Sequence, residues 1–339
     1  MSDWRTDPTY AMCRAVVNGA ELSSFADGPF DVRAVAAAVR PEAKDRFLLD
    51  EVPWENFPQG DHVREAVRLL RADGSPVPAG VGVVSGMCAN DLRAAAALAV
   101  AFLIRIAADP HHSHRDAALA EVPAPARARY FGVASRAELL LHRTGSRHDD
   151  YGSEVTGYPA GWSVAAAQAA ITADAALLLP LLHDPVPATR IRAAYALATV
   201  ADLDGTVRTA LRARFAAEPA PDVCGALLLA TAEITRAPHP PTTALLREYW
   251  QDHTRAPEVR LAAAIGWLCL TDEAAPDDLR AALDGALSRW LTGWEDPRAD
   301  HGGRVVRGGH VAVVQGAQVS GRGDLALCVT VFPLSAQFP

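Results

Sequence analysis

The sequence predicts an all-α fold made of repeated helix pairs, and three observations predict it. Apolar residues recur at three- and four-residue spacing over 160–292, which is the spacing of a half-buried helix. Short turns marked by Asp and Pro separate these stretches. A similar sequence pattern recurs at Ile191, Val223 and Val259, at offsets of 32 and 36 residues. A self-similar unit of that length predicts an α-solenoid, because one helix pair cannot bury its apolar face alone.

The clearest helices follow the apolar stretch Ala173–Leu182. This stretch ends at His183, and Asp184 and Pro185 are expected to be the N-cap and the first residue of the next helix. The helices expected in this part of the chain cover 187–200, 207–217, 223–234, 242–253 and 258–270. Weaker helical patterns cover 31–40, 62–72, 89–108 and 115–122.

Two of the units carry a family resemblance. Ile191–Leu197 (IRAAYAL), preceded by Asp184 and Pro185, and Pro257–Ile265 (PEVRLAAAI) resemble the second helix of HEAT repeats, in the alanine-rich form of high-GC bacteria. The unit at Val223 departs from the pattern, because the next residue is a cysteine where an arginine is expected. The resemblance implies a right-handed solenoid of HEAT-like helix pairs.

The resemblance also implies a structural ladder between adjacent repeats. In HEAT repeats the arginine of the second helix joins neighbouring repeats through the aspartates of the turns. The matching positions in this chain are Asp184, Arg192, Asp222 and Arg260. Truncation of Arg192 or Arg260 is therefore expected to lower stability rather than activity.

The two ends of the chain are expected to differ from the repeats. Residues 1–60 are expected to form N-terminal capping helices, and 61–298 to form the solenoid, clearest over 160–292. A polar, Gly-rich loop at 141–161 interrupts it. Residues 299–339 change to short β-prone runs separated by glycine, so this tail is expected to be a small β cap, a disordered segment or sequence acquired by a frame change.

Charge and composition limit the function. The chain has 339 residues, half of them hydrophobic, and its net charge of −8 disfavours binding to duplex nucleic acid. Residues 297–339 carry +2, which leaves −10 for residues 1–296 and favours a basic partner. No run approaches the roughly 18 apolar residues of a membrane span. With five cysteines at no motif spacing and no secretory signal, the chain is expected to be cytoplasmic.

Several histidines are the only candidates for metal ligands. Imidazoles and carboxylates together are able to hold zinc or iron. These residues lie in expected turns, without a helical His pair or a Cys partner, so they are interpreted as solvated and no metal or cofactor is predicted. They are His111, His112, His114 and His148.

Aromatic residues gather near the end of the repeats, in a chain that has only 6% of them. They are predicted either to pack the last repeats or to form a stacking surface for a peptide, a small ligand or a base. The set and its polar neighbours are Tyr249, Trp250, Asp252, Arg255, Trp290 and Trp294.

Two main classes of function remain. The first is a non-catalytic protein-interaction module, a scaffold or immunity-type binder that uses the concave face of the solenoid. The second is an enzyme on the same architecture, either a glycosylase for alkylated DNA bases or an enzyme of specialised metabolism with a small ligand in the groove. A glycosylase needs a cationic track for phosphates, and Lys44 is the only lysine of this acidic chain. A metal-dependent enzyme rests on the histidines alone. The sequence contains no complete catalytic motif, so we favour the interaction module and leave catalysis open.

Overall fold

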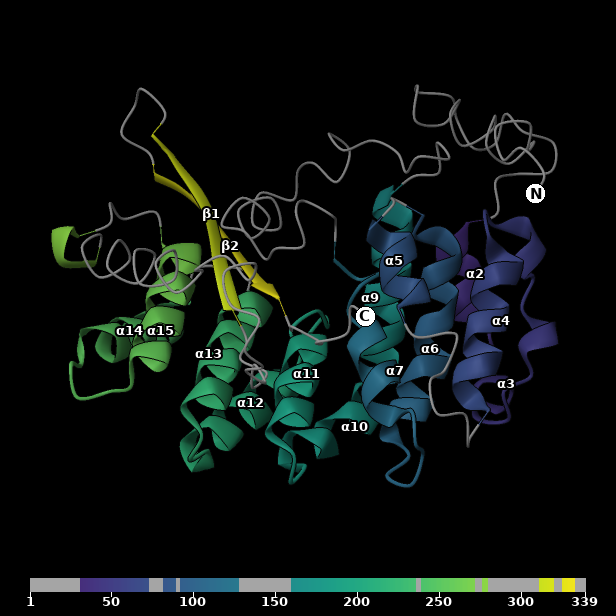
Figure 1. Cartoon of the computed structure of the whole chain (residues 1–339), viewed down its shortest axis with the longest axis horizontal. Coiled ribbons are helices and arrows are strands. Elements are labelled where there is room, and N and C mark those ends of the chain that lie inside the picture. Colours follow the sequence, from purple (N-terminus) through teal and green to yellow (C-terminus); the bar gives the residue numbers. More distant parts are fainter. Residues whose placement is uncertain are drawn as a thin grey trace, which may run out of the picture. The chain divides into compact units, whose positions relative to one another are not determined.

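The structure is a computed structural model that describes residues 31–72, 82–89, 92–127, 160–235, 239–271, 276–279, 311–319 and 325–332. The regular structure of these residues is helical except for two C-terminal strands (Figure 1). The described residues divide into two compact units, one up to Arg214 and one from Phe215 on.

The first unit is built from short and medium helices. In chain order these are α2 (Val32–Ala38), α3 (Pro41–Asp45), η3 (Leu49–Glu51), η4 (Trp54–Asn56), α4 (Gly60–Arg71), α5 (Val83–Ala89), α6 (Ala94–Ala108), α7 (Arg115–Glu121), α9 (Ala160–Ala173), α10 (Ala175–Leu178), η6 (Leu179–His183) and α11 (Pro187–Leu197). Helix α12 (Thr206–Ala217) follows and crosses into the second unit.

Helix α6 is the centre of the first unit. Its residues from Ala94 to Ile104 are all buried, because the helix is apolar around its whole circumference. It packs against α2, α4, α7 and α9 (Figure 1). Among the described residues no single helix is long and apolar enough to cross a membrane; the segments Gly161–Ala173 and Ala175–His183 pass that test only together, with a bend of 64° between them.

The second unit contains α13 (Pro221–Thr235), α14 (Pro240–Gln251) and α15 (Pro257–Leu270). Each of these helices begins with a proline, whose missing amide would have had no partner at that position. Helix α15 lies against both α13 and α14. Their shared core includes Trp267, which is fully buried.

The helices predicted for the repeats are confirmed to within a few residues at each end. The start of α11 is the main difference, because Val186 is its N-cap and Pro187 its first residue. Asp184 instead accepts the amide of Val186 (2.9 Å), so the proposed cap and proline pair lies two residues too early.

The described part of the C-terminal tail consists of two antiparallel strands, β1 (Val311–Val319) and β2 (Leu325–Phe332). Val311 pairs with Phe332 and Val319 with Leu325. The register shifts between Gln315 and Gln318, where β1 has an extra residue in a bulge.

Candidate functional site

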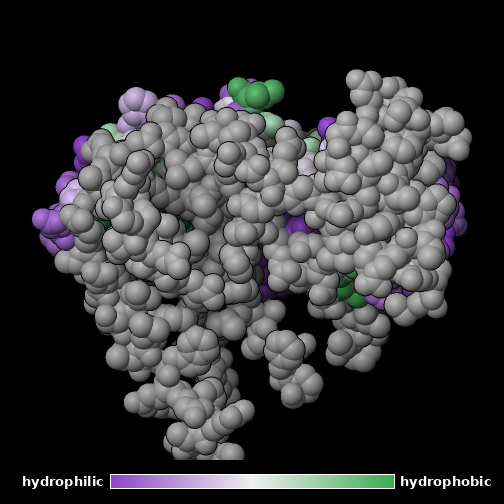
Figure 2. All heavy atoms as spheres, turned by 90° about the horizontal axis from the view of Figure 1, so that it is seen from above, coloured by the Kyte–Doolittle hydropathy of each residue, from purple (hydrophilic) through white to green (hydrophobic). Residues whose placement is uncertain are grey.

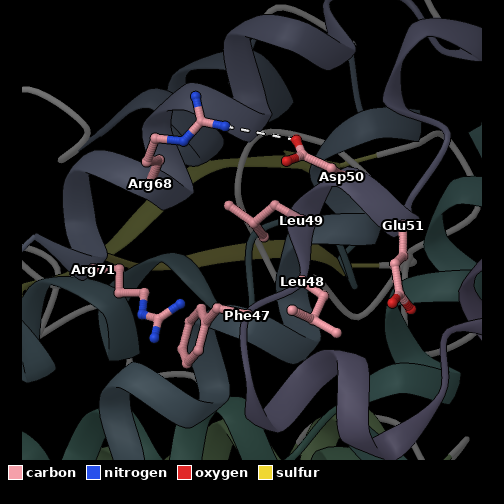
Figure 3. A pocket seen from close by; sticks show the side chains of 7 residues that line it. All are labelled: Phe47, Leu48, Leu49, Asp50, Glu51, Arg68 and Arg71. Carbon is pink, nitrogen blue, oxygen red and sulfur yellow. Dashed lines mark ion pairs between the residues drawn. The ribbon is translucent and has the colours of Figure 1, made fainter.

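A cavity of about 300 Å³ lies between the turn after α3 and the C-terminal half of α4 (Figure 3). Arg68 and Arg71 come from α4, Asp50 and Glu51 come from η3, and apolar side chains lie between them (Figure 3). The volume is at the lower end of the range for ligand pockets and suits a group the size of one amino acid. The lining residues are Phe47, Leu48, Leu49, Asp50, Glu51, Arg68 and Arg71.

The end of α3 places Phe47 in this cavity. The amide of Leu48 donates to the carbonyl oxygen of Ala43 (2.8 Å), and the amide of Phe47 donates to that of Lys44 (3.3 Å). These are the two hydrogen bonds of a Schellman C-cap, which puts Phe47 in the left-handed region with φ of 54°. Glycine is the usual residue there, and a side chain costs on the order of 1 kcal/mol. The chain therefore keeps a strained phenylalanine at the cavity wall.

The ring of Phe47 makes two contacts that offset this strain. Its centroid lies 5.8 Å from that of Phe102, and the guanidinium of Arg71 lies 4.1 Å from its centre. Arg71 also donates to the carbonyl oxygen of Arg46 (3.3 Å). Within the described ranges no carboxylate lies at ion-pair distance from Arg71. Arg71 is exposed, so it carries its positive charge at the surface beside an aromatic ring, without an ion-pair partner among the described residues.

The other charged residues of the cavity differ in how tightly they are paired. Glu51 accepts from Arg40 at 2.7 Å, and Arg68 donates to Glu65 at 2.7 Å. Asp50, whose side chain is 84% exposed, lies 3.7 Å from Arg68, beyond hydrogen-bond distance. Glu51 is thus held by a partner outside the cavity, whereas the contact between Asp50 and Arg68 is loose.

Two close contacts fix the walls of the cavity. The indole of Trp54 donates to the carbonyl oxygen of Leu49 (2.7 Å), which ties η3 to the buried start of η4. A Cβ at Gly60 would overlap the carbonyl oxygen of Trp54, so only glycine lets α4 begin this close to η4. These contacts determine how α4 faces η3.

Two of the candidate metal-binding histidines instead cap α4. His114 Nδ1 lies 2.9 Å from the carbonyl oxygen of Leu70, and His112 Nε2 lies 3.1 Å from that of Arg71. The amide of His114 donates to His112 Nδ1 (3.1 Å), so the proton of His112 is on Nε2, which donates to Arg71. Both rings satisfy carbonyl groups that the end of a helix leaves open.

The other candidate ligands do not join them. The amide of His111 donates to Asp109 (2.9 Å) in an exposed turn, and His148 lies outside the described residues. In the part of the chain that the structure describes, no three His, Cys, Asp or Glu side chains are grouped in a way that suits a metal ion.

Of the aromatic residues predicted either to pack the last repeats or to form a stacking surface, Trp250 lies in the core. Trp250 is 4% exposed and packs on Trp267, with ring centroids 6.2 Å apart. Leu246 and Trp250 are four residues apart on α14, and this spacing turns both toward the core of the second unit. Trp250 is therefore not available for stacking on a ligand. Trp290 and Trp294 lie outside the described residues.

The remaining members of that set form a small group near the end of α14. Tyr249 packs edge-on against Phe215, with centroids 5.1 Å apart, and carries the guanidinium of Arg255 4.2 Å above its ring. Arg255 pairs with Asp252 (3.1 Å), which also accepts from the hydroxyl of Thr254 (2.6 Å). These hydrogen bonds lower the pKa of Asp252. The group is partly exposed, and its polar side chains bind one another.

Three residues of the predicted ladder, Asp184, Asp222 and Arg260, bind groups outside it. Asp184 pairs with Arg115 (2.9 Å), and the buried Nε of Arg192 has no hydrogen-bond partner. Asp222 accepts its neighbouring amide, and Arg260 donates to the carbonyl oxygen of Trp250 (3.3 Å). The long side chain of Arg260 thus reaches a backbone carbonyl group, a partner that the spacing of the repeats in the sequence does not specify.

Sequence reasoning did not single out Glu121. This carboxylate is 4% exposed at the end of α7 and accepts the amides of Gly82 (2.9 Å) and Ser85 (2.7 Å). It therefore caps the start of α5. Burial raises the pKa of Glu121, although these hydrogen bonds act in the opposite direction. The only signal in the sequence was an acid at the end of an apolar stretch.

A second unpredicted network joins α3, α6 and the bend after α9. Arg105 donates to Asp45 (2.6 Å) and, through two nitrogens, to Asp174 (2.9 and 3.3 Å). Desolvation acts against the charge of Arg105, but the two carboxylates outweigh it and raise its pKa. The single lysine, Lys44, lies 4.0 Å from Asp174. The network holds α3 and α6 against the bend.

Comparison of the chain with protein-family models, with curated proteins and with solved structures gave no match. The described surface visible in Figure 2 is largely hydrophilic, with a strongly hydrophobic projection at the top and a small hydrophobic area at the lower right. The large hydrophobic residues exposed in the described part of the chain are Leu177, Val186 and Leu203.

Proposed function

We propose that this chain is a non-catalytic protein-interaction module built as a HEAT-like solenoid. The observation that carries the proposal is the packing of α13 against α15, two helices that are separated in the chain by α14. Stacking of alternate helices is the arrangement that a repeat of helix pairs requires. The two helices also contain the repeated sequence patterns at Val223 and Val259.

Small residues allow this close approach. A Cβ at Gly225 would lie 3.4 Å from the Cβ of Ala262, and a Cβ at Gly266 would lie 3.0 Å from that of Ala232. Glycine and alanine therefore lie at close points of the α13–α15 contact, in a part of the chain that is rich in alanine. Such an interface supports stacking in a solenoid.

Polar contacts in the first unit support the same interpretation. Arg115 pairs with Asp184 (2.9 Å), and Thr189 donates to Asp116 (2.9 Å). These two pairs join the first turn of α7 to the start of α11 and to the turn before it, and α9, α10 and η6 lie between those two helices in the chain. Matched pairs of this kind set the register of stacked helices, which is the role that the resemblance gives to the predicted ladder.

The partner we propose is a basic protein, since residues 1–296 carry a charge of −10. We also propose that the interaction takes place in the cytoplasm. An acidic solenoid attracts a basic partner over long distance, so the affinity should fall as the salt concentration rises.

Affinity capture with the purified full chain, in a lysate of its source organism, tests this proposal. The expected result is a basic protein that is recovered in stoichiometric amount and binds again when both proteins are purified. Calorimetry at about 0.05 and 0.5 M salt should show the weaker binding at high salt that an electrostatic interface predicts. Recovery of no stoichiometric partner, or turnover of a small molecule by the chain alone, would contradict the proposal.

A further inference from the structure

The cavity between α4 and η3 has the features of a binding site for an amphipathic anion. Its positive charge is at Arg71, which has no carboxylate partner in the described chain. The ring of Phe47 lies next to that charge, and Leu48 lines the cavity on the other side of Phe47 (Figure 3). A ligand that fills it therefore has an apolar group and an anionic group only a few bonds apart.

The negative residues of the cavity do not cancel this preference. Glu51 is bound by Arg40 outside the cavity at 2.7 Å. Asp50 is 84% exposed and lies 3.7 Å from Arg68, beyond hydrogen-bond distance, and Arg68 is bound by Glu65 at 2.7 Å, so the charge left for a ligand is that of Arg71. Arg68 and Arg71 lie three residues apart on α4 and therefore share a face of the helix.

We propose that this cavity binds the C-terminal residue of a partner protein, with an apolar side chain and a free α-carboxylate. This inference rests on the proposed interaction function and names the part of the partner that is bound. A chain terminus combines both groups on one residue, whereas an acidic side chain in mid-chain brings no apolar group of its own. Arg71 binds the carboxylate through its guanidinium, and Phe47 and Leu48 contact the side chain.

The strained backbone at Phe47 supports this assignment. A glycine would close the Schellman motif after α3 at lower cost, yet the chain has a phenylalanine at φ of 54°. Its ring holds the Arg71 guanidinium at 4.1 Å, in a fixed position at the cavity. Strain of this kind is concentrated at binding sites, where it positions a side chain before the ligand arrives.

Titration of the full chain with a fluorescent peptide ending in Gly-Gly-Leu tests the inference. The free-acid peptide should bind, and the same peptide with a C-terminal amide should bind about tenfold or more weakly, because a charge-assisted hydrogen bond is lost. Arg71→Ala should weaken the binding of the free-acid peptide by a similar factor and leave the binding of the amide peptide unchanged. Equal binding of acid and amide, or full binding by Arg71→Ala, would overturn the inference.

Two further variants separate binding from folding. Phe47→Gly relieves the backbone strain, so it should fold and still lose binding. Arg46→Ala removes a neighbouring exposed arginine whose side chain does not line the cavity, and it should bind as the wild type does. Circular dichroism of each variant confirms that the fold is retained. The assignment would also be contradicted if Arg46→Ala lost peptide binding while Arg71→Ala kept it.

The source of the carboxylate is decided by competition. N-acetyl-leucine should displace the peptide only at much higher concentration, since a protein terminus makes further contacts along its backbone. If N-acetyl-leucine and the peptide bind with equal affinity, the ligand of the cavity is a small carboxylic acid, and the proposal that it is a protein C-terminus is wrong. Capture of a partner that binds Arg71→Ala equally well would leave the proposed function standing and reject this site.

Discussion

Single charged residues in the first unit link segments that are far apart in the chain. Arg105 is the clearest case, because it joins α6 to Asp45 in α3 and to Asp174 after α9. The side chain of Asp174 is only 12% exposed, so removal of its partner leaves a charge in a poorly solvated place.

Arg105→Ala should therefore lower the free energy of unfolding by about 3 kcal/mol. Arg105→Lys keeps the charge but cannot bind both oxygens of Asp174, so it should retain part of the stability. Urea unfolding followed by circular dichroism measures both. The control is Arg40→Ala, which removes an exposed ion pair with Glu51 and should change little. Equal effects of Arg105→Ala and Arg40→Ala would contradict the structural role of the network.

Glu121 gives a second prediction at the scale of one residue. Because burial raises its pKa in the folded protein above 4.5, its contribution to stability is present below pH 4.5 and is lost as the pH rises through the raised pKa. Glu121→Gln cannot titrate and should lack this pH dependence. Its unfolding free energy should therefore change less than that of the wild type between about pH 4 and pH 7. Glu65→Gln, on the exposed face of α4, serves as the control, and identical pH profiles of wild type and Glu121→Gln would refute the prediction.

At the scale of elements, the glycines show where helices are in closest contact. A Cβ at Gly266 in α15 would lie 3.0 Å from the Cβ of Ala232 in α13, whereas a Cβ at Gly86 in α5 would meet nothing within 4 Å. The first glycine is required by packing, and the second is not.

Gly86→Ala should stabilise the protein by about 0.5–1 kcal/mol, because alanine favours a helix. Gly266→Ala gains the same helix propensity, but overpacking should lower its free energy of unfolding by about 1–3 kcal/mol. The second substitution Ala232→Gly removes the closest methyl group and should recover part of that loss, since the two methyl carbons of Leu246, at 3.3 and 3.4 Å, remain. Thermal unfolding of the two single variants and the double variant measures this coupling. Strict additivity of Gly266→Ala and Ala232→Gly would show that the helices are not packed through these atoms.

The helices of the repeats were predictable because their starts have local signals. Proline at 187, 221, 240 and 257 marks the first residue of α11, α13, α14 and α15, and apolar spacing fixes the rest. The cavity was not predictable, since Phe47 and η3 lie in a short irregular segment with no periodicity. For Trp250 the sequence left core packing and a stacking surface both open, because helical spacing identifies a shared face but does not say whether that face is inside.

At the scale of the whole chain, the division into two compact units raises the question of how far the loss of stability from one substitution extends along the chain. In a solenoid each repeat contacts only its neighbours, so a destabilised repeat loosens those beside it and the effect fades with distance. A single cooperative core would instead lose stability everywhere.

Trp267→Ala tests this difference, because Trp267 is fully buried in the core of the second unit. The truncation should cost about 3–5 kcal/mol locally. Hydrogen exchange followed by mass spectrometry should show faster exchange in α13, α14 and α15, and protection in α6 close to that of the wild type. Phe102→Ala, in α6, is the reciprocal variant and should loosen the first unit while α15 stays protected. If either truncation accelerates exchange equally in α6 and α15, the chain folds as one cooperative unit, and the proposed nearest-neighbour solenoid is wrong.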